Sequence, residues 1–327
     1  MTEADVAARL APLADLRRAI ARAIVGQHDV VEQLLIGLLA GGHCLLEGVP
    51  GLGKTLLVRT LGHALDLGFR RIQFTPDLMP SDILGTELLE EDHGTGHRSF
   101  RFQPGPVFTN LLLADELNRT PPKTQAALLE AMQERTVSYA GVTHVLPVPF
   151  FVLATQNPIE QAGTYPLPEA QLDRFLLNIR VDYPSEVEER DILIATTGTT
   201  AGAVPSVMDA AAVVALQALV RDVHVGADLL LWVTRLVRAT RPGAGGLAVV
   251  GHNVRWGAGP RAGQSLILAA KARALLRGRL AATRDDVTAP AAPVLRHRLV
   301  LAFAAEAEGR DADAVIAEVV RGVPFPA

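Results

Sequence analysis

The sequence predicts an α/β domain with a mostly parallel sheet, followed by a smaller all-helical domain. Up to about residue 183, short and almost continuously apolar runs alternate with segments of helical spacing, the pattern of strands covered on both faces and joined by helices. Beyond residue 184 strand-like runs are rare, and Ala- and Leu-rich helical stripes dominate. A chain of 327 residues is sufficient for two domains, which we place at 1–183 and 184–327.

Capping residues and apolar runs predict the individual helices and strands. Residues 1–26 mix acidic residues with arginines and predict an amphipathic helix rather than a signal peptide. Ser185 and Glu188 form a capping-box pattern that predicts a new helix directly after the domain boundary, and Pro260 is typical of a first helical turn. Five apolar runs predict the strands of one sheet, joined by right-handed crossovers; they span 43–47, 70–74, 111–115, 150–155 and 176–181.

The segment GVPGLGKT carries the first chemical signal. It follows the first expected strand and precedes a helical segment, which is the context in which G-x-x-x-x-G-K-[ST] binds nucleotide phosphates. Lys54 would reach the β- and γ-phosphates, and the Thr55 hydroxyl would ligate Mg²⁺. ATP and Mg²⁺ are therefore the expected ligands, and the loop residues that would hold them are Gly48, Val49, Pro50, Gly51, Leu52, Gly53, Lys54 and Thr55.

Two adjacent carboxylates, Asp115 and Glu116, end the third expected strand. A buried strand that runs into two negative charges requires a positive partner, which we expect to be Mg²⁺ held by Asp115. Glu116 is then expected to polarise the water that attacks the γ-phosphate. Asn157, just past the next strand, suits the positioning of that water, although asparagine is also common in turns.

Composition argues against several classes of function. The net charge is −4 and the isoelectric point is near 6.1, so no global basic field is present to collect nucleic acid. No apolar run approaches the roughly 18–20 residues of a membrane span. The single cysteine, Cys44, excludes an internal disulfide. We therefore expect a soluble, cytoplasmic protein.

Six segments together resemble the MoxR family of AAA+ ATPases. The resemblance is dense over residues 20–183 and thin in the helical part. It implies an AAA+ P-loop core with a five-stranded sheet, a small all-α lid domain, and ATP hydrolysis in a homo-oligomeric ring, expected to be a hexamer. The segments are IVGQ, GVPGLGKT, QFTPDLMPSDILGTELL, FRFQPGPVFTNLLLADELNRTPPKTQAALLEAMQE, VLATQNPIEQAGTYPLPEAQLDRFLL and GAGPRA.

The resemblance also assigns roles outside the phosphate loop. Val25 and Gly26 would pack on the adenine, with a plain helix-entry turn as the alternative. The segment 85–102 resembles the insertion in the second helix of this AAA+ branch, a hairpin that projects toward a central pore or a partner. A solvated loop without a role is the alternative for its acidic end, formed by Glu90, Glu91 and Asp92.

The resemblance gives roles to two arginines, and a third lies within one of the segments that carry it. Arg174 in LDRF would be an arginine finger that acts in trans on ATP bound by a neighbouring subunit; an ion pair with Asp173 or Glu169 is the alternative. Arg261 in GPRA would be the sensor-2 arginine, which reaches from the lid to the nucleotide, or else a surface arginine. Arg119 follows the two acids, and the sequence leaves open whether it faces its own loop or a neighbour.

The function implied by the resemblance is chaperone-like remodelling, activation, or metal or cofactor maturation of a partner protein complex. A protein with a von Willebrand factor A domain would be the usual companion. A nucleic-acid motor and a Mg-chelatase-type motor subunit are the alternatives, as is a nucleotide switch without turnover. The 5% aromatic content and the acidic insertion disfavour nucleic acid as a partner. The residues themselves point only to ATP chemistry.

Overall fold

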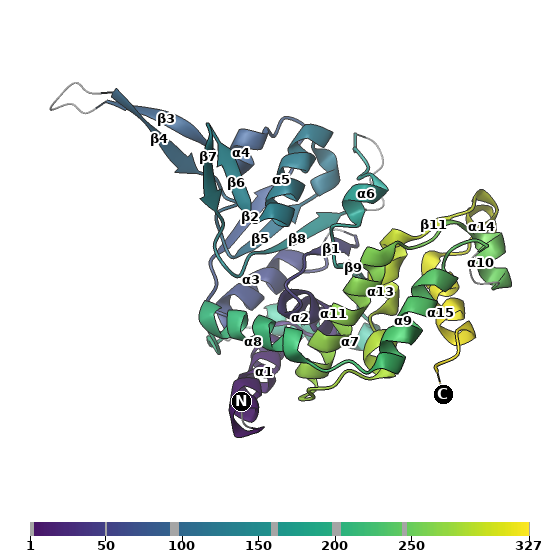
Figure 1. The fold of residues 1–327 in the computed structure, drawn as a ribbon. Coiled ribbons are helices and arrows are strands. Elements are labelled where there is room, and N and C mark those ends of the chain that lie inside the picture. Colours follow the sequence, from purple (N-terminus) through teal and green to yellow (C-terminus); the bar gives the residue numbers. More distant parts are fainter. Residues whose placement is uncertain are drawn as a thin grey trace.

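A computed structural model gives the fold of the chain. It describes residues 3–49, 51–91, 98–157, 163–197, 204–243 and 247–326, without the side chains of residues 3–9. The expected loop residue Pro50 lies outside the described residues, as does Asp92 of the insertion. Figure 1 shows the two parts of the molecule, a sheet flanked by helices and a helical region after it.

A five-stranded parallel sheet forms the centre of the first part. Its strand order is β2-β5-β8-β1-β9, and all four pairings are parallel. These are the five strands that the sequence predicts, each matched to within one residue at both ends. Their bounds are β1 (Cys44–Glu47), β2 (Phe69–Gln73), β5 (Leu111–Asp115), β8 (Phe151–Gln156) and β9 (Leu177–Arg180).

Helices cover both faces of this sheet, which explains the continuous apolar runs. Alternate residues of β5 point to opposite faces: Leu111 and Leu113 join one core cluster, and Leu112 and Ala114 join the other. The first cluster includes residues of α1 (Glu3–Ala23), α2 (His28–Leu39) and α3 (Lys54–Ala64), and the second includes residues of α4 (Pro80–Leu84) and α5 (Pro122–Glu134).

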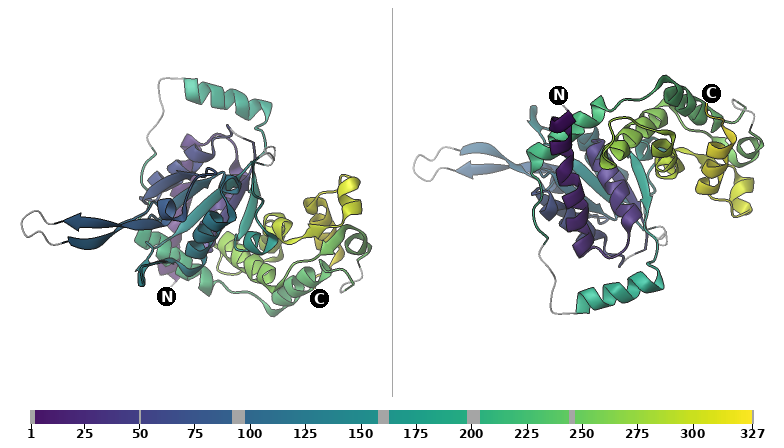
Figure 2. Two further views of the ribbon diagram at one scale, coloured as in Figure 1. Left: turned by 90° about the horizontal axis from the view of Figure 1, so that it is seen from above. Right: turned by 90° about the horizontal axis from the view of Figure 1, so that it is seen from below.

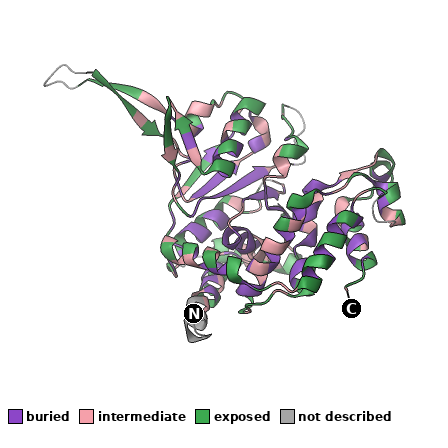
Figure 3. Cartoon of the chain, in the orientation of Figure 1, coloured by how far each residue is buried: buried purple, intermediate pink, exposed green. Residues whose placement is uncertain are grey.

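Two antiparallel hairpins leave the sheet. The larger, β3 (Gly85–Glu91) with β4 (Arg98–Pro104), occupies the segment expected as an insertion and projects from the body with most of its residues exposed (Figures 1 and 3). The smaller pairs β6 (Thr136–Tyr139) with β7 (Val142–Val145). The Phe102 ring stacks on His144 with centroids 4.1 Å apart, so the bases of the two hairpins are in contact.

The second part is mainly helical, as expected. Ser185 and Glu188 form the predicted capping box before α7, and α11 begins at Pro260 and is buried along its apolar stripe. The structure adds a short antiparallel pair of β10 (Val254–Trp256) with β11 (Val300–Leu301). The helices are α7 (Glu186–Thr197), α8 (Ala210–Asp222), α9 (Ala227–Ala239), α10 (Ala248–Asn253), α11 (Pro260–Leu276), α12 (Arg284–Thr288), α13 (Ala291–Leu295), α14 (Phe303–Ala307) and α15 (Ala312–Gly322).

Candidate active site

A cavity of about 280 Å³ lies where β1, β2, β5 and β8 end. The carboxyl ends of parallel strands meet at one edge of a sheet, which is where open α/β sheets bind ligands. Four predicted elements of the site therefore share one cavity: the phosphate loop, Asp115, Glu116 and Asn157. Its lining residues are Gly48, Gly51, Leu52, Gly53, Lys54, Thr55, Arg71, Gln73, Asp115, Glu116, Thr155, Gln156 and Asn157.

The phosphate loop adopts a backbone conformation that its glycines allow. Gly51 and Gly53 have φ values of 87° and 73°, in the region that side chains other than glycine rarely adopt. The loop leads directly into α3, whose N-terminal N–H groups are suited to an anion. Lys54 Nζ donates a hydrogen bond to the Gly48 carbonyl. Burial lowers the pKa of Lys54, while the charge of the acids that end β5 opposes this shift.

The Asp115 carboxylate is held from two sides. Arg71 donates to Oδ2 from Nη2 at 2.6 Å and from Nε at 3.1 Å, and the Thr155 hydroxyl donates to Oδ1 at 2.6 Å. Both partners lie on neighbouring strands, β2 and β8. A guanidinium therefore balances the negative charge at the end of β5, where the sequence predicts a metal ion.

Glu116 occupies a left-handed backbone position, with φ of 58°, which is uncommon outside glycine. The Thr155 hydroxyl accepts the Glu116 N–H at 2.8 Å, so one side chain holds both acids. Gln73 Nε2 donates to the Glu116 carboxylate at 2.8 Å. Arg119 Nε lies 3.2 Å from the same carboxylate, so Arg119 faces the site of its own chain.

Sequence reasoning missed Arg71, Gln73 and Thr155, although a signal for two of them was available. Gln73 ends β2, and Thr155 lies next to the end of β8. The carboxyl ends of all parallel strands converge, so polar residues there are candidates by position. Arg71 is different: it lies two residues before the strand end, and only its pairing with Asp115 across β2 and β5 reveals it.

The residues present fit a Mg²⁺–nucleotide complex. The Thr55 hydroxyl and the Asp115 carboxylate line the cavity beside the Lys54 ammonium group, and hard cations prefer oxygen ligands. In the described part of the chain, no group of three or more His, Cys, Asp or Glu side chains could hold a metal by itself. Mg²⁺ often takes only one or two carboxylates and completes its shell with phosphate and water, as in kinases and ATPases.

Val25 and Gly26 lie outside the described lining of this cavity. Their neighbour Gln27 donates from Nε2 to the Leu52 carbonyl at 3.2 Å, which ties this segment to the phosphate loop. Gln27 also lines a second cavity of about 580 Å³, and Gly26 packs directly against the Glu188 side chain. A base-binding role for Val25 and Gly26 therefore remains a prediction.

The two predicted site arginines also lie away from the cavity. Arg174 Nη1 donates to the Leu129 carbonyl at 2.9 Å. Asp173, one of its expected alternative partners, instead pairs with Arg261 at 3.5 Å and with buried Arg298 at 2.7 Å. Arg174 and Arg261 therefore lie near each other, because Arg174 follows directly after the Asp173 that pairs with Arg261.

Comparison with known proteins decides the family. The AAA family of ATPases associated with various cellular activities matches residues 43–177, and the AAA lid domain matches residues 248–319. Chaperone MoxR1 of Mycobacterium tuberculosis is 47% identical over 308 residues, covering 94% of this chain and 80% of that protein. Protein MoxR of Paracoccus denitrificans is 35% identical over 332 residues, covering 96% of each. The chain belongs to the MoxR family of AAA+ ATPases.

The fold of this MoxR-family chain is also found in a solved structure. A candidate ATPase from Cytophaga hutchinsonii superposes with a TM-score of 0.92 and 39% identity, covering 99% of this chain and 98% of that one. The α/β AAA+ fold expected from the motifs is thereby confirmed. Within the described ranges, no helix combines the length and the apolar character required to cross a membrane.

Proposed function

We propose that this MoxR-family protein hydrolyses ATP with Mg²⁺ and uses the hydrolysis to remodel a partner protein complex. One observation supports the catalytic part of this proposal. The phosphate loop, Asp115, Glu116 and Asn157, which lie far apart in the sequence, line one cavity at the carboxyl edge of the sheet. The family match is consistent with the same chemistry.

Each side chain has a defined task in the proposed reaction. Lys54 and the loop N–H groups bind the phosphates. Thr55 and Asp115 would hold Mg²⁺, which supplies positive charge to the phosphate oxygens when it is bound. Asn157 orients the attacking water, and Glu116 accepts a proton from it as the bond from the water oxygen to the γ-phosphorus forms. ADP leaves with the electrons of the broken phosphoanhydride bond.

Completion of this site requires a neighbouring copy. We propose a ring, expected to be hexameric, in which Arg174 acts in trans on the ATP of the next subunit. Arg261 reaches a nucleotide as the sensor-2 arginine. Its contact with Asp173, next to Arg174, supports a shared role for the two arginines at a subunit boundary.

The remodelling role rests on the relatives. One relative is named as a chaperone, Chaperone MoxR1, and we propose chaperone-like activation or metal or cofactor maturation of a protein complex for this chain. A protein with a von Willebrand factor A domain is the proposed companion, and the cytoplasm is the proposed location.

The substitution Glu116→Gln tests the catalytic assignment and can identify the client. It should abolish release of inorganic phosphate and leave binding of a fluorescent ATP analogue unchanged, because only the proton acceptor is lost. Glu306→Gln, an isosteric change on an exposed residue of α14, serves as the matched control. Continued hydrolysis by Glu116→Gln would contradict the assignment.

The same inactive protein, incubated with ATP and Mg²⁺, should retain its client from a lysate of its own source. Mass spectrometry of the captured material should identify a partner complex. Recovery of nuclease-sensitive DNA without an enriched protein would replace the remodelling proposal by a nucleic-acid motor.

A further inference from the structure

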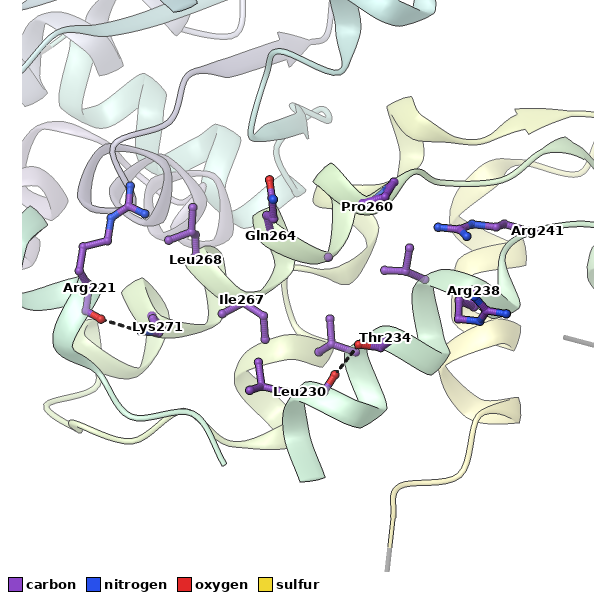
Figure 4. Close-up of a pocket in the computed structure, with 13 residues that line it drawn as sticks. Arg221, Leu230, Thr234, Arg238, Arg241, Pro260, Gln264, Ile267, Leu268 and Lys271 are labelled. Atoms are coloured by element: carbon purple, nitrogen blue, oxygen red, sulfur yellow. Dashed lines mark hydrogen bonds between the residues drawn. The ribbon is translucent and has the colours of Figure 1, made fainter. Parts of the chain in front are cut away.

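A groove of about 820 Å³ lies on the helical part, between α9, α11 and the end of α8 (Figure 4). We call it the lid groove. Its floor is aliphatic and includes Leu230, Val237, Ile267 and Leu268. Leu230, in the first turn of α9, keeps 46% of its surface exposed and can be covered further by a partner. The floor is therefore suited to another apolar surface.

The rim of the lid groove is positively charged. Arg221, Arg238, Arg241 and Lys271 line it, and its described lining contains no Asp or Glu. No ion pair recorded among the described residues involves any of these four cations, although Asp222 acts on Lys271 from outside the lining. Lys271 Nζ donates to the Arg221 carbonyl at 2.7 Å, which keeps the ammonium group at the groove. The rim thus favours an acidic partner.

Helix α7 has the complementary properties. None of its side chains is buried. Val187, Leu193 and Ile194 are 58%, 58% and 67% exposed, and Val187 and Ile194 lie two turns apart on one face. Four acids and one arginine give the helix a net charge of −3, counted as −4 for Glu186, Glu188, Glu189 and Asp191 and +1 for Arg190.

The two surfaces cannot meet readily within one chain. In Figure 2, α7 projects on one side of the sheet domain, and α8, α9 and α11 lie on the other side. The first turn of α7 is held in place, because the Glu188 carboxylate accepts the Ser185 N–H at 2.9 Å and the Ser185 hydroxyl at 2.7 Å. Glu188 also packs against Gly26 of the sheet domain.

We propose that α7 of one copy docks into the lid groove of a second copy. Its aliphatic side chains cover the floor, and its acids face the basic rim. A helix of 12 residues is about 18 Å long, three turns in all. Because α7 and the groove lie on opposite sides of one chain, the contact is head-to-tail, and repeating it generates a ring if the rotation closes. The inference rests on the proposed assembly of copies and identifies one of its contacts.

The composition of the groove favours this occupant over nucleic acid. Among its described lining residues there is no aromatic side chain on which a base could stack. An aliphatic floor with cations only at the rim matches an amphipathic acidic helix, since helices dock through apolar residues spaced by three, four and seven positions.

Crosslinking between copies tests the proposal. The native Cys44 is buried and does not compete. We would mix Ile194→Cys protein with Leu230→Cys or Gln264→Cys protein, in ATP and Mg²⁺, and add a short bismaleimide. A covalent dimer that contains one chain of each variant is expected. Val145→Cys on β7, equally exposed but outside both surfaces, replaces Ile194→Cys in the matched control and should give no such dimer.

Substitutions that place a negative charge in either surface provide a second measurement. Arg238→Glu and Ile194→Asp should each raise the protein concentration at which half of the subunits are assembled about tenfold or more in sedimentation velocity, the effect expected from losing one contributing interface residue. Val145→Asp should leave it unchanged. Because neither Arg238 nor Ile194 lies in the nucleotide cavity, both variants should still bind the fluorescent ATP analogue.

The outcomes separate this inference from the proposed function. A wild-type assembly that forms without crosslinks at either groove position would overturn the α7 contact and leave the ring intact. Crosslinking within one chain of an Ile194→Cys/Leu230→Cys double variant, with no mixed dimer, would assign the groove to the chain's own helix and overturn the proposal. A wild-type protein that neither assembles nor hydrolyses ATP would contradict the proposed function itself.

Discussion

The Arg71 guanidinium lies 2.6 Å from Oδ2 of Asp115, the carboxylate at which the sequence predicts Mg²⁺. The same arginine donates to Gln73, which in turn donates to Glu116. Arg71 therefore balances the charge of Asp115, while Arg119 lies 3.2 Å from the Glu116 carboxylate. A metal ion and Arg71 would compete for one carboxylate.

Replacement of Arg71 by Gln should lower the Mg²⁺ concentration that gives half-maximal ATP hydrolysis. Loss of the competing Arg71 guanidinium leaves the Asp115 carboxylate free for the metal. Partly exposed ion pairs of this kind contribute about 0.2–1 kcal/mol, so the affinity for Mg²⁺ should rise by roughly up to fivefold. A Mg²⁺ titration of phosphate release measures the change. Arg70→Gln, on the exposed next position of the same strand, is the control. An unchanged or higher Mg²⁺ requirement would show that the two cations do not compete.

The substitution Thr155→Val should both destabilise the protein and slow hydrolysis. The hydroxyl that joins the Asp115 carboxylate to the Glu116 N–H is lost, and a part-buried N–H left without an acceptor costs about 1–3 kcal/mol. Thermal unfolding and steady-state phosphate release measure the two effects. Thr124→Val removes a buried hydroxyl that bonds the Leu78 carbonyl, away from the cavity. It should lower stability alone, and an equal loss of activity in both variants would argue against a role of Thr155 at the site.

Arg174→Ala should reduce hydrolysis by about 10³-fold or more and preserve ATP binding, because a trans arginine acts on charge that develops only during phosphoryl transfer. Arg174→Lys should not restore activity, since an ammonium lacks the planar fork. Addition of the variant to wild-type protein should lower activity more than dilution predicts. Specific activity that stays constant when wild-type protein is diluted would instead indicate a site complete within one chain.

The pH dependence of stability should include a contribution from His43. This buried side chain accepts the Val152 N–H at Nδ1 and contacts the Met132 carbonyl through Nε2. Burial lowers its pKa from 6.5 to about 4. Between these pH values the unfolded chain therefore takes up a proton at His43 and the folded chain does not. The contribution of His43 to the free energy of unfolding is fully present above pH 6.5 and is lost as the pH falls toward 4.

The contribution of His43 to the free energy of unfolding has an upper limit set by its pKa shift. A shift of this size corresponds to as much as about 3 kcal/mol. Urea unfolding of wild type and His43→Gln, at pH 7 and pH 5, should show a smaller pH dependence in the variant. Buried His297, whose pKa is also lowered by burial, contributes in the same direction and remains in both proteins. His63→Gln, an exposed control on α3, should keep the wild-type slope. Equal slopes in all three would exclude His43 as a contributor.

The sequence by itself determined the features that depend on local order. Continuous apolar runs predicted the five strands, because a strand buried on both faces has little room for polar residues. The glycines of the phosphate loop allow its left-handed turns, because other residues are strained there. Asp115, Glu116 and Asn157 could be identified from their positions after strands, and they do line one cavity.

The tertiary structure alone decided which distant residues meet. The strand order β2-β5-β8-β1-β9 places β2 beside β5 and β5 beside β8, and only this order brings Arg71 and Thr155 to Asp115. It also placed α7 on one side of the sheet domain and the helices that form the lid groove, α8, α9 and α11, on the other side (Figure 2). Local propensity and periodicity fix what each segment becomes. The pairing of strands and the packing of helices are set by contacts between segments far apart in the chain, and no local pattern encodes them.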